Sequence, residues 1–369
     1  MQALFKLIIR AEIPEELESY KAAISDLLQN YMNVIQVNFK RLALGKDEIL
    51  EELLSDTQQV IYIFRIITDD LAAPLLRSSD ADKLCLRFIQ WIHLTHHKTF
   101  DCPAAITNGN VSILPRKGLP LYYFPCVEQR NLLHLPLFLH EFGHELYLYH
   151  KREMDDLVSE LRRDIADLLI PASLRNDRHS EHQAAKRQSI TDVWYDWMQE
   201  FYCDAVGLIM GGPCFLKSFS TFLSPLRQVD FYRQPEHLIA HHPVTLLRVR
   251  FLVKRASSLG YVELAQTIEK EWLAVAEASN IQEDYHGFYD DILEHVVDEC
   301  LENMLVETDP RPCTDDEVIG QDWHPETDTP IRLLNWAWQV YEQNPSEYFT
   351  WEAEKIPLFS TVDKENHLN

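Results

Sequence analysis

Several features that mark common protein classes are missing from this sequence. Its seven cysteines are scattered over 369 residues and form no Cys-x-x-Cys pair, so neither a disulfide framework nor a cysteine-based zinc site is predicted. No run approaches the roughly 20 apolar residues that span a bilayer. The N-terminal "MQALFKLIIRAEIPEELESYK" lacks the small-residue cleavage site of a signal peptide. We therefore expect a soluble, cytoplasmic protein.

Basic side chains are also scarce. Lysine and arginine number 34 against 58 acidic residues, which gives a formal net charge of -24. Phosphate groups would be repelled by such a surface, so we expect neither nucleic acid nor a membrane as partner. The 46% hydrophobic content is enough for a large core. The oligomeric state is not indicated.

The apolar spacing predicts a mainly α (α+β) protein with three regions: an N-terminal helical region at 1–99, a catalytic core at 100–259 and a C-terminal helical region at 260–369. Only "VSIL" and "LYYF" read as strands, which predicts a small sheet. His93, His96 and His97 close a helix over 81–94, and we interpret them as exposed residues favoured by the helix dipole.

Further helices are predicted along the core. The first covers 135–149, and a second presents apolar residues from Leu157 to Leu168 before Pro171 stops it. The polar "PASLRNDRHSEHQAAKRQS" is predicted to be a loop, with His179 and His182 solvated. A third helix is expected from Thr191 to Met210, and a fourth over 241–260, with Pro243 in its first turn.

The first of these helices contains His-Glu-Phe-Gly-His. Helical spacing places His140 and His144 on one face, one turn apart, where two imidazoles can meet one zinc ion. Glu141 projects beside the metal, where it can take a proton from a water that the metal has made acidic. Gly143 would let a neighbouring backbone or the substrate approach the helix.

The third helix offers the missing ligand. Asp196, Glu200 and Asp204 recur every four residues among large apolar side chains. Like charges at this spacing destabilise an isolated helix, and a cation in front of them would relieve the repulsion. We assign Glu200 as the third ligand and Asp204 as the acceptor that orients a ligand histidine. Asp196 is the alternative ligand.

Together these residues resemble a known family. His140-Glu141-x-x-His144 followed by Glu200-x-x-x-Asp204 resembles the gluzincin metallopeptidases, whose third zinc ligand is the glutamate of a Glu-x-x-x-Asp helix. "HPVTLLR", with His242 and Arg248, is similar to the His-Pro-x-x-x-x-Arg element of HtpX-type and CAAX-protease-type enzymes. The resemblance covers roughly a third of the chain, about 121 to 253.

This resemblance implies a zincin-like fold. In that fold the strand before the motif helix is an edge strand that binds an extended peptide, and "LYYFPCV" occupies that place here. The family's enzymes are commonly embedded in membranes, and this chain departs from them because it has no spanning segment. The first and last thirds of the chain match no pattern of the family.

The resemblance also places His242 and Arg248 near the site, where either could stabilise an oxyanion or contact substrate. For His242 the other interpretation is a helix-start signal, and for Arg248 an ion pair with the acidic helix. Tyr202 is predicted to be a core residue. The remaining histidines of this region are interpreted as structural or surface residues: His134, His150 and His241.

The sequence thus predicts a selective zinc-dependent peptidase, a hydrolase with Zn²⁺ as cofactor and a protein or peptide as substrate. Glu141 would activate water on a metal held by His140, His144 and Glu200. Two alternatives stay open. One is a non-catalytic binding or regulatory module on a zincin scaffold, and the other is a zinc amidohydrolase that acts on small amides.

Overall fold

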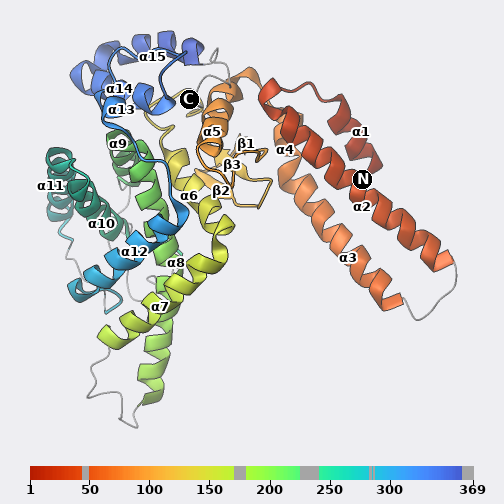
Figure 1. Ribbon diagram of the computed structural model, residues 1–369, viewed down its shortest axis with the longest axis horizontal. Helices are drawn as coiled ribbons and strands as arrows, with labels where there is room; N and C mark the ends of the chain where they lie inside the picture. Colours follow the sequence, from red (N-terminus) through yellow and green to blue (C-terminus); the bar gives the residue numbers. More distant parts are fainter. Residues whose placement is uncertain (44–49, 170–179, 225–240, 282–284, 286, 360–369) are drawn as a thin grey trace. The chain divides into compact units, whose positions relative to one another are not determined.

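The computed structural model describes residues 1–43, 50–169, 180–224, 241–281, 285 and 287–359, with only the backbone of 180–184 and 186. The chain comprises two compact units, Met1–Arg130 and Asn131–Asn369 (Figure 1). Both are rich in helix, and a small sheet lies in the first. The prediction of a mainly helical fold with a small sheet is confirmed. Among the described helices, none is long and apolar enough to cross a membrane.

The described part of the N-terminal unit contains five α-helices. Tyr20, Ile24 and Leu28 are buried at four-residue intervals, as expected for a helix with one apolar face. The long second and third helices pack against each other in antiparallel directions (Figure 1). The helices are α1 (Gln2–Arg10), α2 (Glu18–Ala43), α3 (Leu50–Ile66), α4 (Ala73–Arg77) and α5 (Lys83–Leu94).

The sheet of this unit has three strands: β1 (Ala105–Asn108), β2 (Ser112–Leu114) and β3 (Leu121–Phe124). Their order is β1-β3-β2, with β1 parallel and β2 antiparallel to β3. The predicted role of "LYYFPCV" as an edge strand is therefore wrong, because β3 is hydrogen-bonded on both sides. Leu121, Tyr122 and Phe124 are all buried, and consecutive buried residues are typical of a central strand.

The histidines at the end of α5 differ from their prediction. His93 and His96 are buried, at 1% and 3% exposure, and only His97 is exposed. Eight of the twelve residues of α5 are buried, and His93 near its end is one of them. Nε2 of His93 lies 2.9 Å from the Tyr122 hydroxyl. Burial lowers the pKa of His93 to about 3, which keeps the ring neutral.

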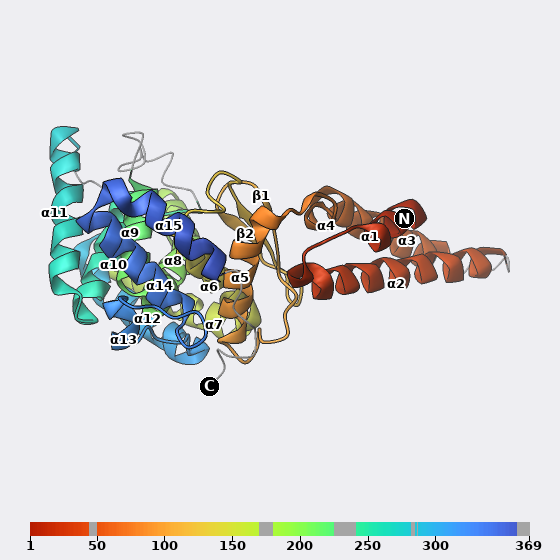
Figure 2. The same cartoon turned by 90° about the horizontal axis from the view of Figure 1, so that it is seen from above.

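The C-terminal unit is built around one long helix, α8. Helices α6, α7, α9, α10 and α12 all pack on it, and Trp194, Trp197 and Phe201 fill the contacts. Helices α14 and α15 lie side by side (Figure 2). The helices are α6 (Leu137–Tyr149), α7 (Lys151–Leu169), α8 (Ser180–Gly211), α9 (Pro213–Leu223), α10 (Thr245–Ser258), α11 (Val262–Ala278), α12 (Glu294–Thr308), α13 (Asp315–Ile319), α14 (Pro330–Gln343) and α15 (Pro345–Phe359).

Two predicted element boundaries in this unit need correction. Helix α8 begins at Ser180, well before Thr191, because "SEHQAAKRQS" lacks glycine and proline and is rich in helix-forming residues. His182 therefore lies in a helix, and its side chain and His179 fall outside the described residues. Helix α10 begins at Thr245, so Pro243 precedes the helix and does not lie in its first turn.

The three predicted regions do not coincide with the two units. The predicted boundary at 99/100 separates α5 from the sheet, although both α4 and α5 pack on β1. The boundary at 259/260 falls between α10 and α11, which pack against each other. The first predicted boundary lies at a change in composition and the second at a helix end marked by Gly260. Turns inside a packed unit carry the same signals.

Candidate metal centre

Helices α6 and α8 approach each other closely at Gly143. A Cβ atom at this position would lie only 2.8 Å from the Cα of Cys203 on α8, a separation that real Cβ atoms do not tolerate. Glycine therefore lets the two backbones meet. The close neighbour of Gly143 is thus the α8 backbone, and the contact brings the histidines of α6 next to Glu200.

The predicted ligands converge at this contact. Nε2 of His140 lies 3.5 Å from Oε2 of Glu200, and Nε2 of His144 lies 3.6 Å from Oε1. Two ligands at about 2.0–2.1 Å from one tetrahedral zinc ion would lie roughly 3.3–3.4 Å apart. The spacing therefore fits a shared ion with little movement. His140 and Glu200 are buried, His144 is partly exposed, and the three side chains could hold a metal ion.

Asp204 orients the first histidine. Its Oδ1 lies 2.8 Å from Nδ1 of His140, which leaves Nε2 directed toward Glu200. Arg248 in turn donates two hydrogen bonds to Asp204, from Nε at 2.9 Å and from Nη2 at 2.7 Å. A carboxylate that accepts from the second ring nitrogen fixes the orientation of a ligand histidine. The structure thus places Asp204 beside one histidine of the potential ligand group.

The acidic stripe on α8 has protein partners for its charge. Nη2 of Arg248 lies 3.2 Å from Oε2 of Glu200 and 2.7 Å from Oδ1 of Asp204. Asp196, the alternative ligand, lies outside the ligand group and pairs instead with Nδ1 of His241 at 2.7 Å. Arg248 thus relieves the repulsion between Glu200 and Asp204. A metal site is therefore indicated by the converging ligand atoms of His140, His144 and Glu200, and not by the repulsion between the acids.

His242 and Arg248 differ in what they offer the site. Arg248 is buried, and its guanidinium is engaged by two carboxylates, so the structure favours the ion pair over an oxyanion role. Nδ1 of His242 lies 3.0 Å from Glu200 Oε2, while 62% of its side chain is exposed. The structure thus brings His242 to the centre from the solvent side, although it does not begin a helix.

The charges at the centre suit metal binding. For Glu200, burial opposes ionisation, but Arg248 and His140 hold its pKa well below the usual value. Burial lowers the pKa of His144 to about 4, so its ring is neutral. For His140 burial also opposes the charged form, but its bonds to Asp204 and Glu200 raise the pKa to about 10. A metal ion would therefore displace one proton, from Nε2 of His140.

Glu141 differs from the other acids of the centre. It follows His140 on α6 and is 6% exposed. Burial raises its pKa to about 7, although the positive charge of His140 works in the opposite direction. A carboxyl group that titrates near neutral pH can both accept and return a proton under physiological conditions.

Phe219 of α9 belongs to the centre, and sequence reasoning missed it. Its ring stacks on His140, with centroids 5.3 Å apart and planes at 25°. The Arg248 guanidinium carbon lies 4.9 Å from the same ring. Only the apolar pattern of residues 213–223 marks this helix in the sequence, and that pattern cannot single out one phenylalanine.

The other aromatic and histidine predictions near the centre concern residues that do not touch the ligands. Tyr202 is fully buried and contacts the ring of Tyr147, as expected of a core residue. His150 is buried with Nδ1 3.6 Å from Glu307. His134 lies within hydrogen-bond distance of Asn131. These positions agree with the structural roles predicted for them.

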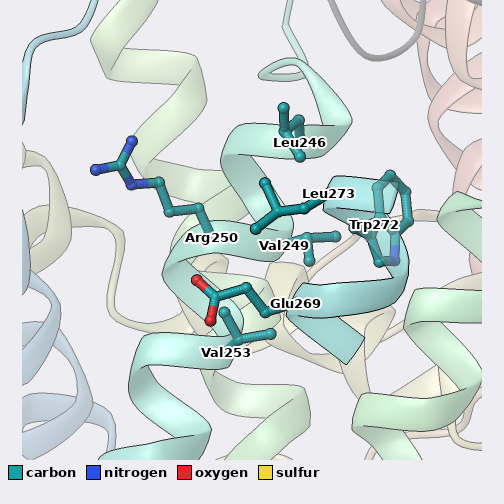
Figure 3. A pocket seen from close by; sticks show the side chains of 7 residues that line it. All are labelled: Leu246, Val249, Arg250, Val253, Glu269, Trp272 and Leu273. Atoms are coloured by element: carbon teal, nitrogen blue, oxygen red, sulfur yellow. The ribbon is translucent and has the colours of Figure 1, made fainter. Parts of the chain in front are cut away.

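A separate cavity of about 190 Å³ lies between α10 and α11 (Figure 3). Leu246, Val249, Leu273 and Trp272 give it apolar walls, and the guanidinium of Arg250 points away from Trp272. That guanidinium is 2.7 Å from Asp291. None of the three potential ligands lines this cavity, so it is distinct from the metal centre.

Comparison of the chain with protein-family models, curated protein sequences and solved structures gives no match. The resemblance to gluzincins therefore remains a prediction from short motifs. The geometry of the site brings together two imidazoles, one buried and one partly exposed, and a buried carboxylate that could share a metal ion.

Proposed function

We propose that this protein is a zinc-dependent peptidase of the gluzincin type. The observation that carries the proposal is the convergence of His140, His144 and Glu200 from two helices, at separations close to those of shared zinc ligands. Asp204, which orients His140, supplies the supporting acceptor that such sites need. Two imidazoles and one glutamate form a donor set used by catalytic zinc, which keeps a fourth position open.

The chemistry assigned to the chain follows from this arrangement. A zinc ion held there would polarise a substrate carbonyl and make a bound water acidic. Glu141 is the general base, since it adjoins His140 and its pKa is raised to about 7. It takes the proton of the attacking water and returns it to the leaving nitrogen. Asp204 and Phe219 keep His140 in position through the 2.8 Å contact between Oδ1 and Nδ1 and through the stacking of the two rings.

A peptide as substrate is supported by the order and spacing of the motifs, which resemble those of peptidases. The central position of β3 removes one argument for it, because this strand has no free edge to pair with an extended chain. A zinc amidohydrolase would also use His140, His144 and Glu200 as ligands and Glu141 as general base. The identity of the cleaved bond distinguishes the two activities.

The proposal is tested by Glu141→Gln together with metal analysis. We expect about one zinc per chain in both wild type and variant, because Glu141 is not a ligand. Cleavage should fall by roughly 10²–10⁴-fold, the usual contribution of a general base. Glu153→Gln, at an exposed position of α7, is the matched control and should cleave normally.

Cleavage is best measured by terminal proteomics of a cell lysate incubated with each protein. New peptide termini that appear with wild type but not with Glu141→Gln would identify the substrate. Equal cleavage by the variant would contradict the mechanism. A zinc-loaded wild type that cleaves neither proteins nor small amides would favour the non-catalytic module.

A further inference from the structure

Exposed apolar side chains are concentrated in the first three helices. Of 24 large hydrophobic residues that are exposed in the described part of the chain, ten lie between Leu7 and Tyr62. This segment is less than a fifth of the sequence, so the concentration is well above an even distribution. Single exposed apolar residues are normal, but a contiguous group of them marks a contact surface.

The pairing of α2 with α3 shows which of these residues share a side. Arg41 and Glu52 form a salt bridge at 3.0 Å across one side of the hairpin, and Asn38 reaches Asp56 at 3.3 Å. These contacts fix the antiparallel register, which Figure 1 shows in the lower right of the view.

Helical spacing then places the apolar side chains. Leu50, Leu54 and Ile61 follow at intervals of four and seven residues, so they form one stripe on α3. A rotation of 100° per residue puts this stripe, and Phe39 of α2, on the side away from the Arg41–Glu52 bridge. With Leu42 at the end of α2, we define the tip patch as Phe39, Leu42, Leu50, Leu54 and Ile61.

The size of the tip patch matches what a stable protein interface needs. Its five side chains are between 47% and 69% exposed. Half-exposed side chains of this size present on the order of 100 Å² each, which gives roughly 500 Å² in total. A standard interface buries about 800 Å² on each partner, of which about 60% is apolar. The tip patch alone supplies that apolar share.

The charge of the hairpin favours a second copy as the partner. Helix α2 carries three basic and two acidic residues, and α3 carries one basic and three acidic, a net charge of -1 for the two helices. The whole chain carries -24. Two copies therefore repel each other less through this hairpin than through most other surfaces. Within the described helices α2 and α3, the four basic residues are interspersed with five acidic ones and do not form the larger basic cluster that anionic lipid would attract.

We propose that the tip patch joins two copies of this chain in a symmetric dimer. In such a dimer the α2–α3 hairpins pack face to face, so that four helices enclose the apolar side chains of both patches. Each copy uses the same residues, which is the self-complementary contact of a two-fold axis. The dimer is independent of the chemistry proposed for the metal centre.

The test measures the mass of the full chain by analytical ultracentrifugation from about 1 to 100 µM. Wild type should be a dimer at the upper end, and added salt should strengthen it because the repulsion between the acidic copies is screened. Leu54→Glu combined with Ile61→Glu should weaken dimerisation by roughly 100-fold or more, since it buries four unpaired charges.

The matched control is Val37→Glu combined with Tyr62→Glu. These residues are 52% and 63% exposed on the same helices, but point away from the tip patch. The control should dimerise like wild type, and helix content should be unchanged in both double variants. A wild type that stays monomeric at 100 µM would overturn the proposal, as would equal dissociation of the control. So would a monomer that sediments with phosphatidylserine vesicles through the same residues.

Discussion

Helices α5 and α6 both carry buried histidines in an apolar setting, one in each unit, yet their chemistry differs. His93 of α5 meets the hydroxyl of Tyr122 at 2.9 Å. His140 of α6 meets Asp204 at 2.8 Å and Glu200 at 3.5 Å. The first is a neutral core residue with a pKa of about 3, and the second has a pKa of about 10. The neighbouring acids make this difference.

His144 resembles His93 in its protonation state. Burial lowers its pKa to about 4, much as burial lowers that of His93. By charge alone the two residues look alike. They differ because a carboxylate oxygen of Glu200 lies 3.6 Å from His144, beside a second imidazole. Whether a neutral histidine is a core residue or a potential ligand therefore depends on the donor atoms around it, and not on its own pKa.

The largest expected effect is the loss of zinc affinity when either histidine of the potential ligand group is replaced. His140→Gln and His144→Gln should each lower zinc affinity by more than the roughly 10–100-fold that loss of a supporting partner costs. His93→Gln should leave about one zinc per chain. Metal content after dialysis, together with competition against a chelator, measures both. Comparable loss from His93→Gln would show that the metal lies elsewhere or that folding controls it.

The second prediction concerns the support of His140. Asp204→Asn keeps the shape of the side chain but removes the charge that pairs with Arg248, so zinc affinity should fall by about 10–100-fold. Asp155→Asn is the control. Asp155 lies in the same unit and accepts a hydrogen bond from Tyr195 at 2.7 Å, but it is outside the group of potential ligands. It should bind zinc like wild type. Unchanged affinity in Asp204→Asn would remove its orienting role.

The third prediction uses the pH dependence of His93. The unfolded chain protonates this residue near its usual pKa of 6.5, whereas the folded chain resists until about 3. Below pH 6.5 the unfolded state binds more protons, so the free energy of unfolding falls as pH falls. Between pH 7 and 5 the loss from this residue is about 2 kcal/mol.

Urea unfolding of wild type and His93→Gln at these two pH values isolates the contribution. The variant has no imidazole at this position, so its free energy of unfolding should fall by about 2 kcal/mol less than that of wild type. Parallel pH profiles for the two proteins would mean that His93 is protonated in the folded state.

The smallest effect is expected at the helix contact. Gly143→Ala places a methyl group 2.8 Å from the Cα of Cys203, which forces α6 and α8 apart and should weaken zinc binding by about tenfold. Gly207, which lies on α8, provides the control. A methyl group there would lie 2.3 Å from the ring of Phe215. Gly207→Ala should therefore destabilise the unit while zinc affinity stays within about twofold.

Much of the candidate site could be predicted from the sequence because its members follow helical spacing. His140, His144, Glu200 and Asp204 repeat at four-residue intervals on two helices, and the structure brings them together as expected. The contact of Arg248 with Asp204 was one of two open interpretations. Helical content and the two strands at 112–114 and 121–124 also agree with the apolar patterns.

What the sequence could not provide depends on packing between distant segments. The centrality of β3 depends on β1, whose sequence carries little strand signal. The burial of His93 depends on neighbours from other elements, because its own helix end resembles an exposed one. Phe219 joins the centre only because α9 packs beside α6 and α10. None of these contacts leaves a periodic trace in the chain.

The supports of α9 and of the segment before α6 have a consequence for the order of synthesis. Asn335 of α14 accepts from the Cys214 amide at 2.9 Å, and Trp338 donates to Ser218 at 3.0 Å. Glu352 of α15 accepts from the Leu132 amide at 2.7 Å. A ribosome adds about 5–20 residues per second, so several seconds pass between completion of the last residue of the centre and the emergence of these helices. A nascent chain thus carries the three potential ligands His140, His144 and Glu200 before the two helices that support α9 and the segment preceding α6 have emerged.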